Sequence, residues 1–214
     1  MGKPSQRPLR IAKLGGHFAK YAGEATVEAV SAAASALGAQ ETAELPLAAA
    51  GRAAGALITY AEAGELHRER LKSDRHRLDP LIRYRLTAAA LTPAQWYLQA
   101  QRVRRMLKQQ IDSLFATYDL LIAPATPFPA RTIGTETVEL GRETIPARSA
   151  AGIMTQPLTP TGVPIAVVPL WPLAGEGLPV GVQLIAKPWC EADALAAAFM
   201  LEQAGIAKAP IAKL

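Results

Sequence analysis

The chain has 214 residues, of which 50% are apolar and 19% are charged, so it can bury a core and is not a largely disordered protein. Its formal net charge of +5 is too small to indicate nucleic-acid binding by itself. The single cysteine excludes an intrachain disulfide, and the three histidines lack the short spacings of metal ligands, so we expect no metal and no cofactor.

The first half of the sequence predicts an alternation of strands and helices. In the longest predicted helix, the apolar positions from Trp96 to Leu114 recur at steps of three and four residues and so share one face. Alanine, the best helix former, dominates residues 47–71. These patterns predict strands over 9–14 and 42–45 and helices over 26–37, 47–71, 79–89 and 92–117.

The second half is dominated by short, strongly apolar runs. A run that is apolar at nearly every position is typical of a strand buried on both faces. A closing helix is predicted over 191–203, with Leu195 and Phe199 among its inward residues. Residues 136–148 are expected to form a surface hairpin or a loop. The strands predicted in this half cover residues 119–124, 165–170 and 179–186.

These elements predict an α/β fold in which a mixed β-sheet is covered by helices. We divide the chain into a polar N-terminal tail (1–8), one domain (9–205) and a C-terminal tail (206–214). No apolar run reaches the roughly 18 residues of a membrane-spanning helix, and no secretory signal is visible. We therefore expect a cytoplasmic protein that contacts neither membrane nor nucleic acid.

Few side chains offer the chemistry of a self-sufficient catalyst. A serine hydrolase needs an activated nucleophile and oxyanion donors, but none of the six serines lies in a Gly-x-Ser-x-Gly turn. Ser149 is the only serine next to the apolar strands, and a helix cap is its simpler interpretation. Cys190 stands at the start of the last predicted helix, where a thiol can become reactive, although a structural cysteine is the simpler interpretation.

Basic residues are concentrated in the middle of the chain. The stretch from Arg68 to Arg85 contains seven Lys or Arg residues interleaved with acids, which favours a solvated helix face over an anion or nucleic-acid site. Arg83 and Arg85 differ from the rest because they lie in an otherwise apolar run, so at least one of them can face inward. A guanidinium in that position would hold a carboxylate through two parallel hydrogen bonds.

Three motifs follow one another in the second half. They are D-x-L-x-x-P-x-x-P from residue 119, G-x-P-x-x-x-x-P from residue 162 and G-L-P-x-G-x-Q from residue 177. In this order they resemble the C-terminal portion of the amidase signature family, and the likeness extends over most of residues 9–205. Within the family, the sequence is most similar to the bacterial biuret- and carboxybiuret-type amidohydrolases and to amidotransferase A-subunit homologues.

The resemblance implies a mixed α/β sheet and hydrolysis of a carboxamide to an acid and ammonia. Members of the family use a serine nucleophile, a second serine with a cis peptide bond and a lysine, all in segments N-terminal to the part matched here. No Gly-Gly-Ser-Ser run occurs in this sequence, so no catalytic residue is assigned and we expect the chain to be inactive alone.

The resemblance also implies a set of substrate-binding residues. Thr155, Gln156 and Thr159 correspond to a family segment beside the substrate. Arg83 is the nearest match to an arginine that holds the substrate's carboxylate in the amidotransferase branch. That branch has an acid where this chain has Gly152, which argues against an amidotransferase role.

The resulting hypothesis is the C-terminal part of an amidase, which supplies sheet and substrate pocket but not the catalytic serines and lysine. Its substrate would be a small linear amide, and its partner an N-terminal amidase half or a second copy of the chain. The alternative is a non-catalytic binding or interaction domain on an amidase-like scaffold, whose exposed apolar strand edges would need a partner to cover them.

Overall fold

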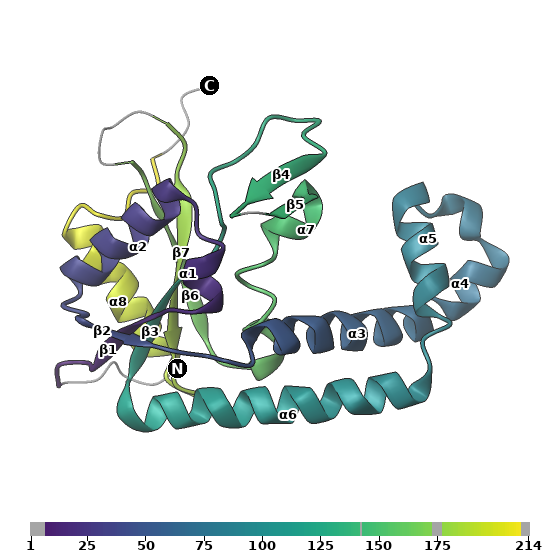
Figure 1. The fold of residues 1–214 in the computed structure, drawn as a ribbon, viewed down its shortest axis with the longest axis horizontal. Coiled ribbons are helices and arrows are strands. Elements are labelled where there is room, and N and C mark those ends of the chain that lie inside the picture. Colours follow the sequence, from purple (N-terminus) through teal and green to yellow (C-terminus); the bar gives the residue numbers. More distant parts are fainter. Residues whose placement is uncertain (1–6, 142, 173–176, 211–214) are drawn as a thin grey trace.

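The structure is a computed structural model that describes residues 7–141, 143–172 and 177–210 (Figure 1). Its centre is a five-stranded sheet with the strand order β2-β1-β3-β7-β6. Strand β1 is parallel to β2 and β3, whereas β7 is antiparallel to β3 and β6, so the sheet is mixed, as predicted. The strands are β1 (Ile11–Leu14), β2 (Glu41–Ala43), β3 (Leu120–Pro124), β6 (Ile165–Leu170) and β7 (Val180–Ala186).

Strand β3 lies in the middle of the sheet, and all five of its residues are buried. Because alternate side chains of a strand point to opposite faces, Leu120 and Ile122 enter one core and Leu121 and Ala123 enter the other. The first core contains residues of α2 (Glu24–Ala36) and α8 (Glu191–Gln203), and the second contains residues of α6 (Ala94–Thr117). Cover on both faces explains the continuous apolar run in the sequence.

Helices α3 (Ala48–Leu66) and α6 pack along each other and form an arm that extends away from the sheet (Figure 1). At its far end lie α4 (Arg68–Ser73), the 3-10 turn η1 (Arg75–Arg77) and α5 (Pro80–Ala89). The prediction of one helix over 47–71 is therefore wrong at its end, because α3 stops at Leu66 and α4 starts separately after His67. A Cβ atom on Gly64 would lie 2.6 Å from the backbone nitrogen of Ala90, so the absent side chain permits the close contact between α3 and α5.

The remaining elements are short and lie outside the central sheet, and the 3-10 turn among them packs against α3 and α6. Within the expected range 136–148, residues 137–140 and 143–146 pair as the two strands of a hairpin, and residues 147 and 148 already belong to the short helix that follows. Ser149 lies inside that short helix, not at its N-cap, so the interpretation of Ser149 as a cap is wrong. These elements are α1 (His17–Lys20), β4 (Thr137–Leu140), β5 (Glu143–Pro146), α7 (Ala147–Ala151) and the 3-10 turn η2 (Thr159–Thr161).

Helix α8 turns its small residues toward the sheet. Ala194 and Ala197 are buried over β6 and β7, whereas Leu195 is 47% exposed and Phe199 is 58% exposed. The prediction that Leu195 and Phe199 face inward is therefore wrong. Alanines allow the helix to approach the sheet closely, and the large side chain that is buried on that side is Leu201, near the end of the helix.

Asp119 ties the N-terminal residues to the sheet. Its side chain is 4% exposed and accepts hydrogen bonds from Arg7 at 2.8 Å, from Arg10 at 3.1 Å and from Lys187 at 2.7 Å. Burial alone would raise the pKa of Asp119, but the hydrogen bonds from Arg10, Arg7 and Lys187 outweigh burial and hold the pKa well below its usual range.

The described residues contain neither a membrane-spanning helix nor a cluster of metal ligands. Within the described ranges, no helix combines the length and the apolar character needed to cross a bilayer. In the same part of the chain, no three His, Cys, Asp or Glu side chains lie close enough together to hold a metal ion.

Candidate functional site

A turn-rich segment, residues 152–162, forms one wall of the candidate site, and we refer to it as the pocket loop. Met154 and Leu158 anchor it, because both side chains are fully buried in the core beside α6. Gln183 of β7 is itself buried, and its side-chain nitrogen donates to the carbonyl oxygens of Pro124 at 2.7 Å and Met154 at 3.3 Å. The sheet therefore fixes the inner side of the pocket loop.

Helices fix the other sides of the pocket loop. The Nε2 atom of His17 lies 2.9 Å from the Ile153 carbonyl oxygen, and Arg104 of α6 donates from Nε to the Pro160 carbonyl oxygen at 2.8 Å. Burial lowers the pKa of His17, the bond to Ile153 opposes this, and the nearby charge of Arg52 lowers the pKa further. Because a carbonyl oxygen only accepts, the neutral His17 carries its proton on Nε2.

A pocket of about 410 Å³ lies between the pocket loop and the arm. The pocket loop contributes Gln156, Thr159 and Pro160, and three helices, α3, α5 and α6, contribute the rest. The lining residues from the helices are Gly55, Ala56, Ile58, Thr59, Tyr60 and Glu62 of α3, Arg85 of α5 and Arg104 of α6. The pocket therefore joins parts of the chain that are far apart in sequence.

Two arginines give the pocket its charge. Arg85 donates to the Tyr60 hydroxyl oxygen at 2.7 Å, and its guanidinium lies 5.6 Å from the centre of the Tyr60 ring. Arg104 donates from Nε to the Pro160 carbonyl oxygen of the pocket loop and from Nη1 to the Gln101 side-chain oxygen at 3.3 Å. Within the described ranges, neither guanidinium forms an ion pair with a carboxylate. The acid that lines the pocket, Glu62, accepts a hydrogen bond from Tyr97 at 3.0 Å.

Of the four residues that the sequence suggested for substrate binding, Gln156 and Thr159 line the pocket, whereas Thr155 and Arg83 do not. Thr155, Gln156 and Thr159 lie on the pocket loop, where the Thr159 hydroxyl donates to the Thr155 carbonyl oxygen at 3.1 Å. Arg83 lies on α5 but does not line the pocket, and Arg85, two residues further on, does. The Nε atom of Arg83 is buried without a hydrogen-bond partner in the described part of the chain.

Arg52 and Arg104 are site residues that the sequence did not single out. Arg104 belongs to a group of four cations on the long helix, and nothing in their spacing separates it from the others. Arg52 stands between glycine and alanine in the alanine-rich helix, where the sequence gives no sign that a guanidinium faces the pocket loop.

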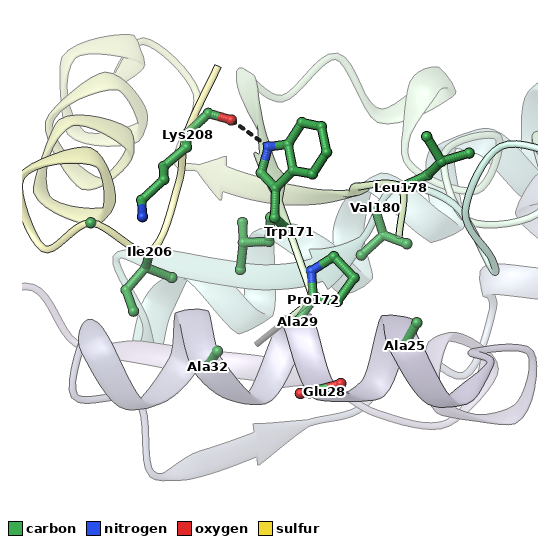
Figure 2. Close-up of a pocket in the computed structure, with 12 residues that line it drawn as sticks. Ala25, Glu28, Ala29, Ala32, Trp171, Pro172, Leu178, Val180, Ile206 and Lys208 are labelled. Carbon is green, nitrogen blue, oxygen red and sulfur yellow. Dashed lines mark hydrogen bonds between the residues drawn. The ribbon is translucent and has the colours of Figure 1, made fainter. Parts of the chain in front are cut away.

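A second hollow, of about 350 Å³, lies against α2 (Figure 2), on the face of the sheet that α2 and α8 cover. Ala25, Ala29 and Ala32 form its floor, and the indole nitrogen of Trp171 donates to the Lys208 carbonyl oxygen at 2.8 Å across its rim. Glu28 and Lys208 supply one charge of each sign. The pocket on the arm has two arginines and one acid in its lining, so it is the better candidate for recognition of a negatively charged ligand.

Comparison of the sequence with known proteins identifies relatives. Residues 3–195 match the family model described as Amidase. The chain is 44% identical over 200 residues to AtzE, the 1-carboxybiuret hydrolase component of Pseudomonas sp. (strain ADP), in an alignment that covers 94% of this chain and 44% of that protein. It is 40% identical over 110 residues to the Glutamyl-tRNA(Gln) amidotransferase A-subunit of Bartonella quintana (strain Toulouse), covering 51% of this chain and 21% of that protein. The chain thus spans less than half the length of these relatives.

Two solved structures are similar to this chain in fold. One belongs to "an unexpected vestigial protein complex" that "reveals the evolutionary origins of an s-triazine catabolic enzyme"; it is 44% identical with a TM-score of 0.90, covering 94% of this chain and 44% of that one. A crystal structure of an amidase shares the fold at 23% identity, with a TM-score of 0.83, covering 94% of this chain and 47% of that one. By its sequence and its fold, the chain belongs to the amidase family.

Proposed function

We propose that this chain forms the substrate-binding wall and part of the sheet of an amidase that hydrolyses a small linear amide to an acid and ammonia. The observation that carries the proposal is the pocket where Arg85, Arg104 and Gln156 meet, in a chain 44% identical to a 1-carboxybiuret hydrolase component. These residues span 44% of that relative and contain no Gly-Gly-Ser-Ser run. The proposal therefore assigns the reactive serines and lysine to the part of the enzyme that these residues do not span.

The charge of the pocket favours a substrate that carries a carboxylate. Arg85 and Arg104 contribute two positive charges and Glu62 one negative charge, so the lining is net positive. A guanidinium forms its strongest hydrogen bonds with a carboxylate, often through two parallel contacts. 1-Carboxybiuret, which the Pseudomonas relative is named for, is a linear amide with a carboxyl group, and we propose a substrate of this kind here.

Each pocket residue has a role in this proposal. Arg85 and Arg104 hold the carboxylate, and Thr155, Gln156 and Thr159 position the amide end of the substrate. Arg83 is proposed as a further substrate contact on the strength of the resemblance alone, because in the structure it lies on α5 outside the lining of the pocket. The proposed enzyme works in the cytoplasm, with an N-terminal amidase half or a second copy of this chain as its partner, and requires no cofactor.

Ammonia release tests the proposal. The purified chain alone is expected to release no ammonia from biuret or carboxybiuret, and release by the chain alone would refute the assignment of the nucleophile to another part. Co-expression with a polypeptide that carries the Gly/Ser-rich amidase segment, encoded next to this reading frame, is expected to give ammonia release. Arg85→Met should abolish most of it, whereas Arg102→Met on the exposed side of α6 should not.

The same experiment separates the two functions left open by the sequence. A complex that forms and still releases no ammonia would favour the alternative, a non-catalytic binding domain on the amidase scaffold. Loss of activity in both arginine variants would show that the pocket charge has no specific role.

A further inference from the structure

The side chain of Gln156 is held by one cation from the arm. Arg52 of α3 donates from Nε to the Gln156 side-chain oxygen at 2.8 Å, and from a terminal nitrogen to the Ser149 carbonyl oxygen at 3.2 Å. Arg52 itself is partly buried, and no described carboxylate forms an ion pair with it. A single guanidinium thus joins α7, the pocket loop and the arm.

This contact decides which end of the Gln156 carboxamide faces which way. A guanidinium has only donors, so the atom that faces Arg52 must be the oxygen Oε1. The amide nitrogen Nε2 must then lie on the other side, and it does so over Gly152. Both hydrogens of Nε2 remain available, since the hydrogen bonds of the described residues use Gln156 only through its oxygen and its backbone.

Gly152 provides the space for this arrangement. A Cβ atom on Gly152 would lie 2.6 Å from Nε2 and 2.9 Å from Cδ of Gln156, closer than real Cβ contacts come. The carboxamide of Gln156 therefore fills the place that a side chain at position 152 would take. Any larger residue there would push the amide group away from Arg52.

We propose that Arg52 is a positioning residue that fixes the polarity of the pocket wall and so determines ligand specificity. Gln156 lines the pocket and its Oε1 is held by Arg52, so the polar atom it keeps for a ligand is Nε2, and the ligand group beside it must be an acceptor, a carboxylate or carbonyl oxygen. A ligand that places an amine or amide N–H there meets donor against donor and gains no hydrogen bond from Gln156, so it binds less tightly than a ligand with an acceptor in that place. The inference rests on the proposed function, because it concerns the same pocket.

Nuclear magnetic resonance on the full chain observes the amide directly. The side-chain NH₂ signals of Gln156 are identified by their loss in Gln156→Glu. Arg52→Met is expected to shift these signals and to collapse the separation of the two proton frequencies toward that of a solvent-exposed glutamine. Arg52→Lys should behave like Arg52→Met, because a single ammonium does not reproduce the two directed contacts. Arg102→Met, which removes an exposed arginine of α6, should leave the signals in place.

Ligand binding measures the consequence for specificity. Malonate presents an acceptor oxygen in every orientation, whereas malonamide, of similar size, must turn a carbonyl oxygen and not its NH₂ group toward Gln156. Calorimetry on the full chain gives both affinities. Arg52→Met is expected to weaken malonate binding about tenfold and to reduce the preference for malonate over malonamide about fivefold, because the freed carboxamide can turn its oxygen to the ligand. Gly152→Ala should change the preference in the same direction without removing any charge.

The outcomes separate this inference from the proposed function. If Arg52→Met leaves the Gln156 signals and the malonate preference unchanged in a folded chain, the positioning role of Arg52 is wrong, whatever the chain does with amides. If the parent chain binds neither malonate nor malonamide, the proposed carboxylate pocket is wrong, while the amide signals still decide whether Arg52 orients Gln156. If Arg52→Met unfolds the chain, Arg52→Lys and Gly152→Ala provide the same two measurements.

Discussion

Asp119→Asn is the substitution that tests the electrostatic support of the sheet. The change keeps the size and shape of the side chain and removes its charge. In the native chain this buried carboxylate accepts hydrogen bonds from three cations and from the backbone nitrogen of Arg10 at 3.0 Å. Asparagine would turn an N–H donor toward at least one of these cations, and two donors repel each other.

The size of the effect follows from the burial of the partners. Removing one partner of a fully buried ion pair costs about 3–5 kcal/mol. Here only the carboxylate is fully buried, because the side chains of Arg7 and Arg10 are 57% and 50% exposed and can return to water. We therefore expect a loss of about 3 kcal/mol, at the lower end of that range, which corresponds to a fall in Tm of about 6–12 °C for a domain of this length.

The pH dependence gives the same test a second readout. The pKa of Asp119 is lowered by folding, so its contribution is complete above the unfolded value near 4 and is lost as the pH falls below that value. The Tm difference between parent and variant should accordingly be constant from about pH 7 to 5 and shrink as the pH falls from about 4 to 2.

Asp112→Asn is the matched control. Asp112 is 45% exposed and pairs with Lys108 at 2.8 Å one helical turn away, an interaction worth less than about 0.5 kcal/mol. Thermal unfolding of both variants should separate them clearly. Equal Tm values for the two variants at pH 7, or an Asp119→Asn difference that does not change between pH 5 and 2, would refute the reasoning.

Three further predictions concern packing and titration. Gly51→Ala should lower the free energy of unfolding in urea by about 1–3 kcal/mol, because the new Cβ would collide with the buried Leu107 side chain. Leu107→Ala alone should cost about 2–5 kcal/mol. The double variant should lose less than the sum of the two, because the smaller side chain at position 107 makes room for the new Cβ. Gln183→Met should cost about 2 kcal/mol in the same assay, because two buried carbonyl oxygens lose their donor. His17 has a lowered pKa in the folded chain, so the parent should lose stability as the pH falls below about 6.5, and His17→Gln should flatten that part of the profile; identical profiles would contradict it.

The sheet was predictable because the apolar runs of its strands indicate in the sequence that these residues are buried. Strand β3 is apolar at every position, which requires cover on both faces, and the structure supplies α2 and α8 on one face and α6 on the other. Helix α8 was predicted as an element but not in its orientation. Its alanines and its large apolar residues both recur at helical spacing, and only the distance between helix and sheet decides which set faces inward.

The arginines of the candidate site show a limit of the same kind. The sequence marks both Arg83 and Arg85 as cations in an apolar helix, but two residues correspond to a rotation of about 200° around the helix axis. Which arginine faces the pocket depends on how α5 docks, and it docks through Leu86 and Ala89, its buried residues, beside Gly64 of α3. This contact joins segments more than 20 residues apart, so periodicity within α5 could not reveal it.

The pocket loop concentrates the selectivity of the site in very few groups. Its backbone is fastened from the sheet by Gln183, from α1 by His17 and from the arm by Arg104. The hydroxyl groups of Thr159 and Thr161 donate hydrogen bonds to backbone carbonyl oxygens within the loop. Gln156 is therefore the loop side chain that keeps donors for a ligand. Because the backbone around it is fastened independently, a change at Arg52 should alter what the pocket accepts more than it alters whether the chain folds.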